Sequence, residues 1–537
     1  MAEIVAIAIA LLALVITASI AARRLALSEP LLLVPIGLAV SWVPGVPEVR
    51  LDPNLVLHLF LPLLVYATAI DVPWKQFRAN LRPIGFLGIG LVVFTTTGVA
   101  IAAHAVVPEL SWPAAFALGA IVSPPDELTA AAVIDRLPIP RRISVILQGE
   151  GLVNDVMALT IFRYAVLAAA TGMFSFSHAG EFFFAVLAGG ALWGFLVGWG
   201  TLWVRGHLDD PRLETTVSLI TPFAAYFLPE YYGATGVLST AVAGLVVNSQ
   251  SARMISAGTR LNAKPLWGMI DYWLNGVLLL LLGLQIKSVA ESVPTGRMVE
   301  YLLVSAAVAG TAIALRFLWV YVTAYTPGVW RTASGTGGAP RGNRLFFISW
   351  TGMRGAISLA AALALPLVLP DGKAFPARDL IIFVTFTVII FTLIVQGGSL
   401  PLLIRMLGLE REGHQERDKA TRSEYDARIR TLEAGIAHMD SLVAGGVVPR
   451  DVGDRYRRER EHRQKTFERH RRAHADREWR EIARHELGAL MEATQAERDE
   501  LLRLRSAGEI DDDTLHRIER DLDEQELRLQ ARQDTLS

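Results

Sequence analysis

Three polar side chains, those of Glu150, Asn154 and Asp155, lie within a mainly apolar run that extends from Ile143 to Ala170. The run is long enough to cross a membrane, where an aspartate at the bilayer centre costs at least about 2.5–3.5 kcal/mol. Such residues usually face a protein interior and act on ions or protons. A carboxylate with amide and carbonyl oxygens nearby suits a hard monovalent cation or a proton. We therefore interpret Asp155 as an ion- or proton-carrying group, with a buried structural pair as the alternative.

The spacing within this run indicates different roles for the three side chains. Glu150 and Asn154 are four residues apart and share one face of a helix, whereas Asp155 lies about 100° further round. Gly151 lies one turn before Asp155 and leaves room for a partner helix or water. Glu150 needs a cationic partner at that depth, and Arg316, in a later apolar run, is the best candidate. We predict that Glu150 and Arg316 form a structural ion pair.

Two other stretches place charge beside residues that interrupt helices. In "SPPDE", Pro124 and Pro125 break the helix directly before Asp126, because proline supplies no backbone donor. The stretch "SWTGMRGAIS" has glycines on both sides of an arginine, namely Gly352, Arg354 and Gly355. We predict unwound backbone at both places, with Asp126 in position to cap the half-helix that begins there. Arg354 is expected either to form a second ion pair or, with the flanking glycines, to support the second broken helix.

These side chains require membrane-spanning helices to position them. A hydrocarbon core about 30 Å thick needs roughly 20 apolar residues per helix. The chain has 537 residues, is 52% hydrophobic and has no cysteine, which excludes disulfides and thiol-bound metals. We predict an all-α polytopic membrane protein with thirteen spans. They are 4–21, 30–43, 54–70, 84–107, 113–133, 143–170, 180–204, 214–228, 232–249, 265–287, 299–325, 344–369 and 380–406.

The basic residues of the loops support this count and orient the chain. With the N-terminus outside, the inner loops carry 16 lysines or arginines and the outer loops carry 5. Basic residues are enriched in cytoplasmic loops, and a miscounted span would scramble the alternation. We expect a multi-pass protein of the plasma membrane, in contact with lipid, with an outside N-terminus and a cytoplasmic tail. Arg163, towards the outer end of the sixth span, is expected to extend its charge to the outer surface.

The two interrupted spans occupy equivalent positions in the chain. They are the fifth and the twelfth, so a division into six helices, a connector and six helices makes them counterparts in an inverted repeat. Unwound backbone at membrane depth is tolerated where it is buried in protein or lines a cavity. We predict that the two broken helices cross at an ion site near the midplane. The alternative is that both interruptions reflect the general frequency of proline and glycine in membrane helices.

The last quarter of the chain has a different composition. From Glu410 onward it holds 57 of the 103 charged residues. This change predicts a transmembrane domain over 1–409 and a charged, helical cytoplasmic domain over 410–537. A weaker hypothesis gives the basic, histidine-containing part of this tail a role in sensing pH or binding anionic lipid.

The end of the tail carries a leucine repeat. Leu515, Leu522 and Leu529 recur every seven residues, and Ile518 adds to the same stripe. A seven-residue apolar repeat is typical of helices that pack against one another. We expect the tail to pack on itself or on a partner tail.

Taken in order, these motifs resemble those of sodium/proton antiporters of the electroneutral cation–proton antiporter family, bacterial type. "GEGLVNDVMALTIF" resembles the G-E-S-L-x-N-D signature, and "SPPDE" resembles the S-P-T-D-P or S-P-P-D of a broken fifth helix. "WTGMRGAISLA" resembles the family's W-G-G-L-R-G-A-x-S-L-A, and "LNGVLLLLLGLQI" resembles its tenth helix. The resemblance extends from Ile4 to Leu409.

The resemblance implies a thirteen-helix fold with a six-helix core and a dimerisation domain, assembled as a homodimer. It implies that Asp155 carries the cation or proton and that Asp126 and Asn154 line the site. It also implies the pair between Glu150 and Arg316. An asparagine directly before the carrying aspartate is the pattern associated with electroneutral exchange, one cation for one proton.

Two positions depart from the family pattern. Pro125 replaces a threonine that donates a ligand in some members, and Glu127 stands where proline or a small residue is usual. The first departure bears on the cation shell, and the second adds a charged group near the site. Selectivity among sodium, potassium and lithium is therefore less constrained than exchange itself.

The expected function is exchange of sodium for protons by alternating access, with lithium and potassium as further candidate cations. The alternatives are a potassium/proton or broad monovalent cation/proton exchanger and, more distantly, a cation channel. An enzyme is not expected, because the sequence has no intramembrane serine–histidine pairing, no H-E-x-x-H motif and no nucleotide-binding loop. We expect no cofactor and no nucleic acid partner; sodium and the proton are transported substrates.

Overall fold

The computed structural model describes most of the chain, and the described residues are mainly helical. They divide into two compact units, Met1–Glu412 and Gly413–Ser537. The division falls three residues after the predicted domain boundary at Leu409. The described residues are 2–25, 28–44, 51–127, 130–131, 137–172, 176–294, 296–326, 328–330, 342–370, 372–473 and 477–536.

Helices lie in all thirteen predicted spans, with the fifth and twelfth interrupted as predicted, which confirms the all-α membrane fold class. Among the residues searched, 7 helical segments are long and apolar enough to cross a membrane, and two shorter apolar helices accompany them. The helical segments of the first unit are α1 (Ala2–Arg24), α2 (Pro30–Ser41), α3 (Pro53–Leu55), η1 (Val56–Phe60), α4 (Leu61–Asp71), α5 (Trp74–Ala79), α6 (Leu81–Gly85), η2 (Phe86–Leu91), α7 (Val92–Val106), α8 (Trp112–Val122), α10 (Arg141–Thr171), α11 (Phe176–Arg205), α12 (Pro211–Tyr231), α13 (Gly236–Met254), α14 (Ala257–Glu291), α15 (Met298–Tyr325), α16 (Gly342–Trp350), α17 (Ala356–Leu363), α18 (Arg378–Phe391), η3 (Thr392–Gly397) and α19 (Gly398–Met406).

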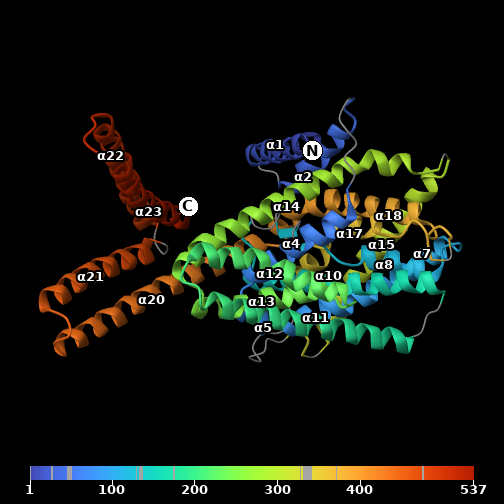
Figure 1. Ribbon diagram of the computed structural model, residues 1–537, viewed down its shortest axis with the longest axis horizontal. Coiled ribbons are helices and arrows are strands. Elements are labelled where there is room, and N and C mark those ends of the chain that lie inside the picture. Colours follow the sequence, from blue (N-terminus) through green and yellow to red (C-terminus); the bar gives the residue numbers. More distant parts are fainter. Residues whose placement is uncertain are drawn as a thin grey trace. The chain divides into compact units, whose positions relative to one another are not determined.

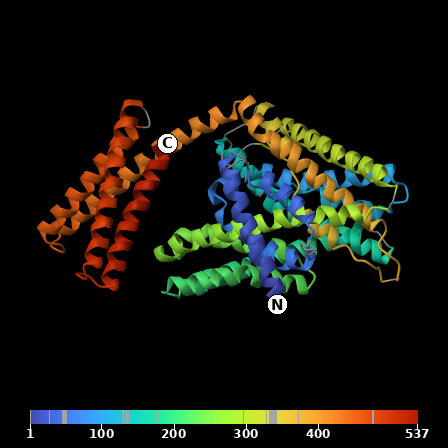
Figure 2. The same ribbon diagram turned by 90° about the horizontal axis from the view of Figure 1, so that it is seen from above.

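The helices of the first unit form two groups. In one group, α10 packs against α8, η2 and α6, while α15 packs against α7, α16 and α18; Figure 2 shows α15 beside α18. We call α6 to α10, with η2, and α15 to α19, with η3, the core bundle. The other group, α1 to α4 with η1 and α11 to α14, is the scaffold bundle, in which α11, α12 and α13 lie side by side (Figure 1). The core bundle thus contains spans four to six and eleven to thirteen, which are counterparts seven spans apart, as the predicted inverted repeat requires.

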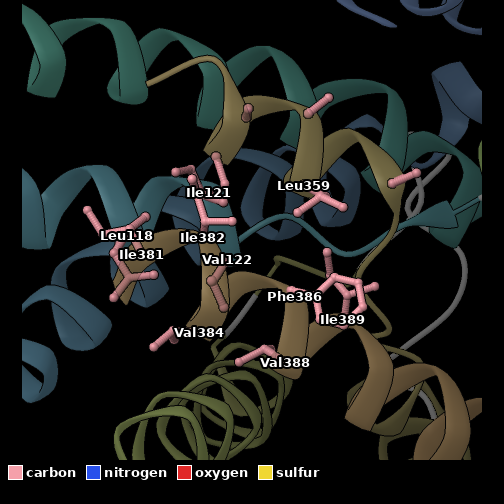
Figure 3. Close-up of a cluster of buried hydrophobic side chains, with 14 of the residues drawn as sticks. Leu118, Ile121, Val122, Leu359, Ile381, Ile382, Val384, Phe386, Val388 and Ile389 are labelled. Carbon is pink, nitrogen blue, oxygen red and sulfur yellow. The ribbon is translucent and has the colours of Figure 1, made fainter. Parts of the chain in front are cut away.

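Aliphatic side chains fill the core bundle where α8, α17 and α18 meet (Figure 3). Leu118 and Ile121 of α8, Leu359 of α17 and Ile381 of α18 are each no more than 2% exposed. Buried alanines on α8 and α17 let these helices approach closely, as small residues do between membrane helices. This packing fixes the C-terminal end of α8, where the fifth span is interrupted.

The second unit is built from antiparallel helices, α20 (Leu409–Ala444), α21 (Arg450–Ala473), α22 (Arg477–Ser506) and α23 (Asp512–Leu536). Ion pairs join α20 to α21, with Arg457 2.6 Å from Asp440 and Arg471 2.7 Å from Asp426. Arg498 of α22 pairs with Asp523 and Glu526 of α23. These pairs are exposed or half-exposed, so each contributes only about 0–1 kcal/mol to stability.

The leucine repeat of α23 faces a neighbouring helix of the same chain. Leu515 and Leu522 pack with Leu501 of α22, and Leu529 is buried as well. The assignment of Ile518 to this stripe is wrong, because its side chain is 39% exposed. Ile518 lies about 60° round the helix from Leu515, beyond the side that α22 covers.

Candidate ion-binding site

The interruption of the fifth span exchanges one intrahelical hydrogen bond for two bonds to the twelfth span. In a continuous helix, the backbone N–H of Asp126 would donate to the carbonyl of Val122. Instead it donates to the carbonyl of Met353, with an N–O distance of 2.6 Å. The Val122 carbonyl accepts from Nε of Arg354 at 2.8 Å. The two interrupted segments therefore contact each other directly, and Arg354 satisfies the end of α8.

The twelfth span is non-helical over 351–355, between α16 and α17. Arg354 is 2% exposed, and its backbone N–H donates to Oγ1 of Thr392 at 3.1 Å. One of its guanidinium nitrogens also donates to the carbonyl of Gly352. A Cβ atom at Gly355 would overlap the Asp126 carboxylate, so this glycine creates the space that the carboxylate occupies.

We call the place where the two interrupted spans contact each other the crossing. Asn154 and Asp155 bring side-chain oxygens from α10 to this crossing. Asn154 is fully buried, and its Nδ2 donates to the carbonyl of Pro125 at 3.0 Å. Its Oδ1 atom is buried without a hydrogen-bond partner. Asp155 is partly exposed. Because Asn154 bonds to Pro125, the residue before Asp126, α10 places Asn154 and Asp155 beside the interruption that carries Asp126.

Glu150 and Arg316 form a buried, bidentate ion pair between α10 and α15. The Nη1–Oε1 distance is 2.5 Å and the Nη2–Oε2 distance is 3.1 Å, and both side chains are at most 2% exposed. Arg316 also donates through Nε and Nη2 to the carbonyl of Ile348, at 3.2 and 3.0 Å. Ile348 is in the last turn of α16, where carbonyls lack intrahelical partners. Arg316 therefore supports the twelfth span as well as neutralising Glu150.

Cavities reach the crossing from two sides. A cavity of about 470 Å³ is lined by Glu127, Gln148 and Asp271, and by residues of α4 and α11 to α14. A second cavity, of about 200 Å³, is lined by Asp126 and again by Asp271. Asp155 instead lines a space of about 10 Å³, room for about one water, with Pro124 and Ser358 among its walls. Asp126 and Glu127 thus line cavities of about 200 and 470 Å³, whereas the space next to Asp155, between α10 and the interrupted spans, is much smaller.

Comparison with known proteins agrees with this arrangement. The family described as "Sodium/hydrogen exchanger, transmembrane" matches residues 7–406. The chain belongs to this sodium/hydrogen exchanger family. An uncharacterized Na(+)/H(+) exchanger of Mycobacterium tuberculosis is 36% identical over 405 residues, covering 74% of this chain and 73% of that protein. A sodium, potassium, lithium and rubidium/H(+) antiporter of Bacillus pumilus is 31% identical over 442 residues, covering 80% of this chain and 64% of that protein.

A solved structure shows the same fold. The sodium proton antiporter MjNhaP1 from Methanocaldococcus jannaschii matches with a TM-score of 0.58, over 76% of this chain and 100% of that chain. The two sequences are 18% identical, so the likeness concerns the fold alone.

The exchanger has further acidic residues near the crossing. Glu127 lies against Gly151, where a Cβ atom would overlap its carboxylate, and its Oε2 is buried without a hydrogen-bond partner. Asp271 of α14 accepts from Nδ2 of Asn275 at 3.0 Å and lines both larger cavities. Asp271 is not among the site residues predicted from the sequence, although it is an acidic residue inside a predicted span, as Asp155 is.

Gly355→Ala is expected to impair the exchanger without unfolding it. The new methyl group would displace the Asp126 carboxylate, a movable side chain, and not the backbone. The cation concentration for half-maximal exchange should rise about tenfold, the effect of losing one charged ligand contact. This concentration is measured from cation-dependent proton movement in proteoliposomes.

Gly310→Ala is the matched control, because no atom lies within 4 Å of a Cβ built at Gly310 in α15. It should leave exchange unchanged. An unaltered half-maximal concentration in Gly355→Ala would show that the position of the Asp126 carboxylate does not matter for cation binding.

Proposed function

We propose that this exchanger is a secondary active antiporter that exchanges sodium for protons across the plasma membrane by alternating access. The observation that carries the proposal is the contact between the two interrupted spans beside α10, where Asn154, the neighbour of Asp155, donates to the carbonyl of Pro125, the neighbour of Asp126. Two like charges close together in a low-dielectric interior favour binding of a proton or a cation. One carboxylate that holds either species, but not both, is sufficient for exchange.

The proposed site uses oxygen atoms of Asp155, Asp126 and Asn154. The unpartnered Oδ1 of Asn154 is suited to a cation, because a buried acceptor without a donor is costly unless a ligand satisfies it. Hard monovalent cations prefer such oxygens. Arg354 and the pair of Glu150 with Arg316 act in this proposal as supports for the broken helices.

The unequal cavities support alternating access over a channel. Arg205, Arg260 and Lys264 line the cavity of about 470 Å³, and basic residues mark the cytoplasmic side of a membrane protein. With this orientation the N-terminus and the Thr171 end of α10 are outside, and the described conformation is open to the cytoplasm. Towards the outer side, Asp155 lines a space of only about 10 Å³. A channel needs a path that is open to both sides at once.

A broad monovalent cation/proton exchanger is the second candidate. The Bacillus pumilus relative carries potassium, lithium and rubidium in its name besides sodium. In this chain, Pro125 has no side-chain oxygen, and its carbonyl already accepts from Asn154. A shell with fewer fixed oxygens selects less strictly by cation size, which favours breadth.

Purified protein in liposomes with an internal pH indicator tests both candidates. Sodium added outside should move protons in the opposite direction, and lithium and potassium added in turn should separate a sodium-selective exchanger from a broad one. Exchange of one cation for one proton should proceed at the same rate under an imposed membrane potential. No proton movement with any of the three cations would refute antiport, and a rate that follows the voltage would refute one-for-one exchange.

Homodimeric assembly belongs to the same proposal, and the mass of the purified particle tests it.

A further inference from the structure

The surface between the core and scaffold bundles is largely apolar. Leu152 and Val156 of α10 belong to one hydrophobic cluster with Leu61 of α4, Tyr226 of α12 and Val237 of α13. Apolar contacts are non-directional, so one bundle can move against the other without breaking hydrogen bonds. Alternating access requires movement of this kind. An apolar surface by itself, however, does not stabilise either of the two conformations between which the bundles move.

An ion pair crosses from one bundle to the other. Arg163 of α10 in the core bundle pairs with Oε2 of Glu230 in the last turn of α12. The second carboxylate oxygen, Oε1, accepts from the backbone N–H of Gly236, the first residue of α13, at 2.9 Å. Glu230 is therefore fixed to the scaffold bundle, whereas Arg163 belongs to the helix that carries Asp155. Arg163, expected from the sequence to extend its charge to the outer surface, is 36% exposed and is paired with Glu230 as well.

The ion pair lies on the closed side of the site. Arg163 is eight residues after Asp155, about 12 Å further along α10. It directly follows Phe162, which lines the space of about 10 Å³ with Asp155 and Ala158. The Arg163 side chain is 36% exposed and that of Glu230 is 14% exposed, so the pair is partly shielded from water.

We propose that Arg163 and Glu230 form a latch that holds the outer side closed and must separate before Asp155 becomes accessible from outside. This inference rests on the proposed alternating-access antiport. The latch residues act through the position of α10 and not on the ion, so their removal shifts the balance between the two conformations. A merely structural pair would affect the stability of the protein without changing this balance.

The absence of cysteine from the chain allows a direct test. Ala158→Cys places a reporter on the small outer space, and Ser251→Cys places one on the cavity of about 470 Å³. A membrane-impermeant maleimide is applied from the outer or the inner side, and the labelling rate is measured. Arg163→Gln should raise labelling of Ala158→Cys from outside about fivefold, as expected for loss of a partly exposed ion pair. It should lower labelling of Ser251→Cys from inside.

Matched variants complete the test. Glu230→Gln should reproduce Arg163→Gln, and Arg163→Lys, which keeps the charge, should restore the original labelling rates. Arg297→Gln is the control, because it removes an ion pair between Arg297, directly before α15, and Glu300 in the first turn of α15, which joins no other helix. Unchanged labelling in Arg163→Gln, with or without a lower melting temperature, would overturn the latch. Labelling does not require transport, so failure of the latch and failure of the antiport proposal can be told apart.

Discussion

Asp155→Asn is expected to reduce cation-dependent proton movement in proteoliposomes to the level of vesicles without protein. Asparagine keeps the size of the side chain and an amide oxygen, but it cannot exchange a proton for a cation. The protein should remain folded, because removing a charge from membrane depth does not raise the cost of burial. The neighbouring Asp126 should not replace Asp155, because it lines a different cavity and lies on a different span.

Asp209→Asn provides the matched control for this loss. Asp209 is exposed between α11 and α12, so the same change of charge is made away from the crossing. The exchange rate of the Asp209→Asn variant should equal that of the unmodified protein. Exchange that persists undiminished in Asp155→Asn would contradict the assignment of Asp155 as the carrying group, whichever cation is used.

The features that sequence predicted best follow from the high cost of charge and unsatisfied backbone in a membrane. That cost is the reason why Glu150 was predicted to need a cationic partner, and in the structure Arg316 forms an ion pair with Glu150. The same cost limits unwound backbone to protein interiors, and the segments at Asp126 and Met353 meet there. Such requirements can be read from single residues because the bilayer offers no alternative partner.

The features that sequence did not predict depend on how separate helices face each other. Glu230 lies two residues after the predicted end of the eighth span, so the sequence predicted it to be in a loop. Its pairing with Arg163 depends on how α12 packs near α10, which the sequence does not reveal. Ile518 fits the leucine repeat by spacing, but its exposure depends on how much of α23 is covered by α22. The carbonyl bonds of Arg354 and Arg316 could not be predicted either, because side-chain types do not reveal which carbonyls a broken helix leaves free.

Arg316→Met is expected to cause the largest loss of stability among single substitutions in the core bundle. It leaves the Glu150 carboxylate buried without its partner and removes two of the donors to the Ile348 carbonyl. Removing one member of a buried ion pair costs about 3–5 kcal/mol. Thermal unfolding in detergent should show a clearly lower melting temperature, while Arg428→Met, which breaks an exposed pair with Glu424 in α20, should change it little.

The double variant Glu150→Gln/Arg316→Met separates the electrostatic part of this loss from the structural part. Once Glu150 is neutral, no uncompensated charge remains, so the double variant should be more stable than Arg316→Met alone. It should stay less stable than the unmodified protein, because the Ile348 carbonyl at the end of α16 still lacks both bonds from Arg316 and keeps only the one from Oγ1 of Thr351, at 3.1 Å. A melting temperature of Arg316→Met equal to that of the unmodified protein would refute the support role of the pair. A double variant no more stable than Arg316→Met would assign the whole loss to the broken twelfth span and none to the unpaired carboxylate.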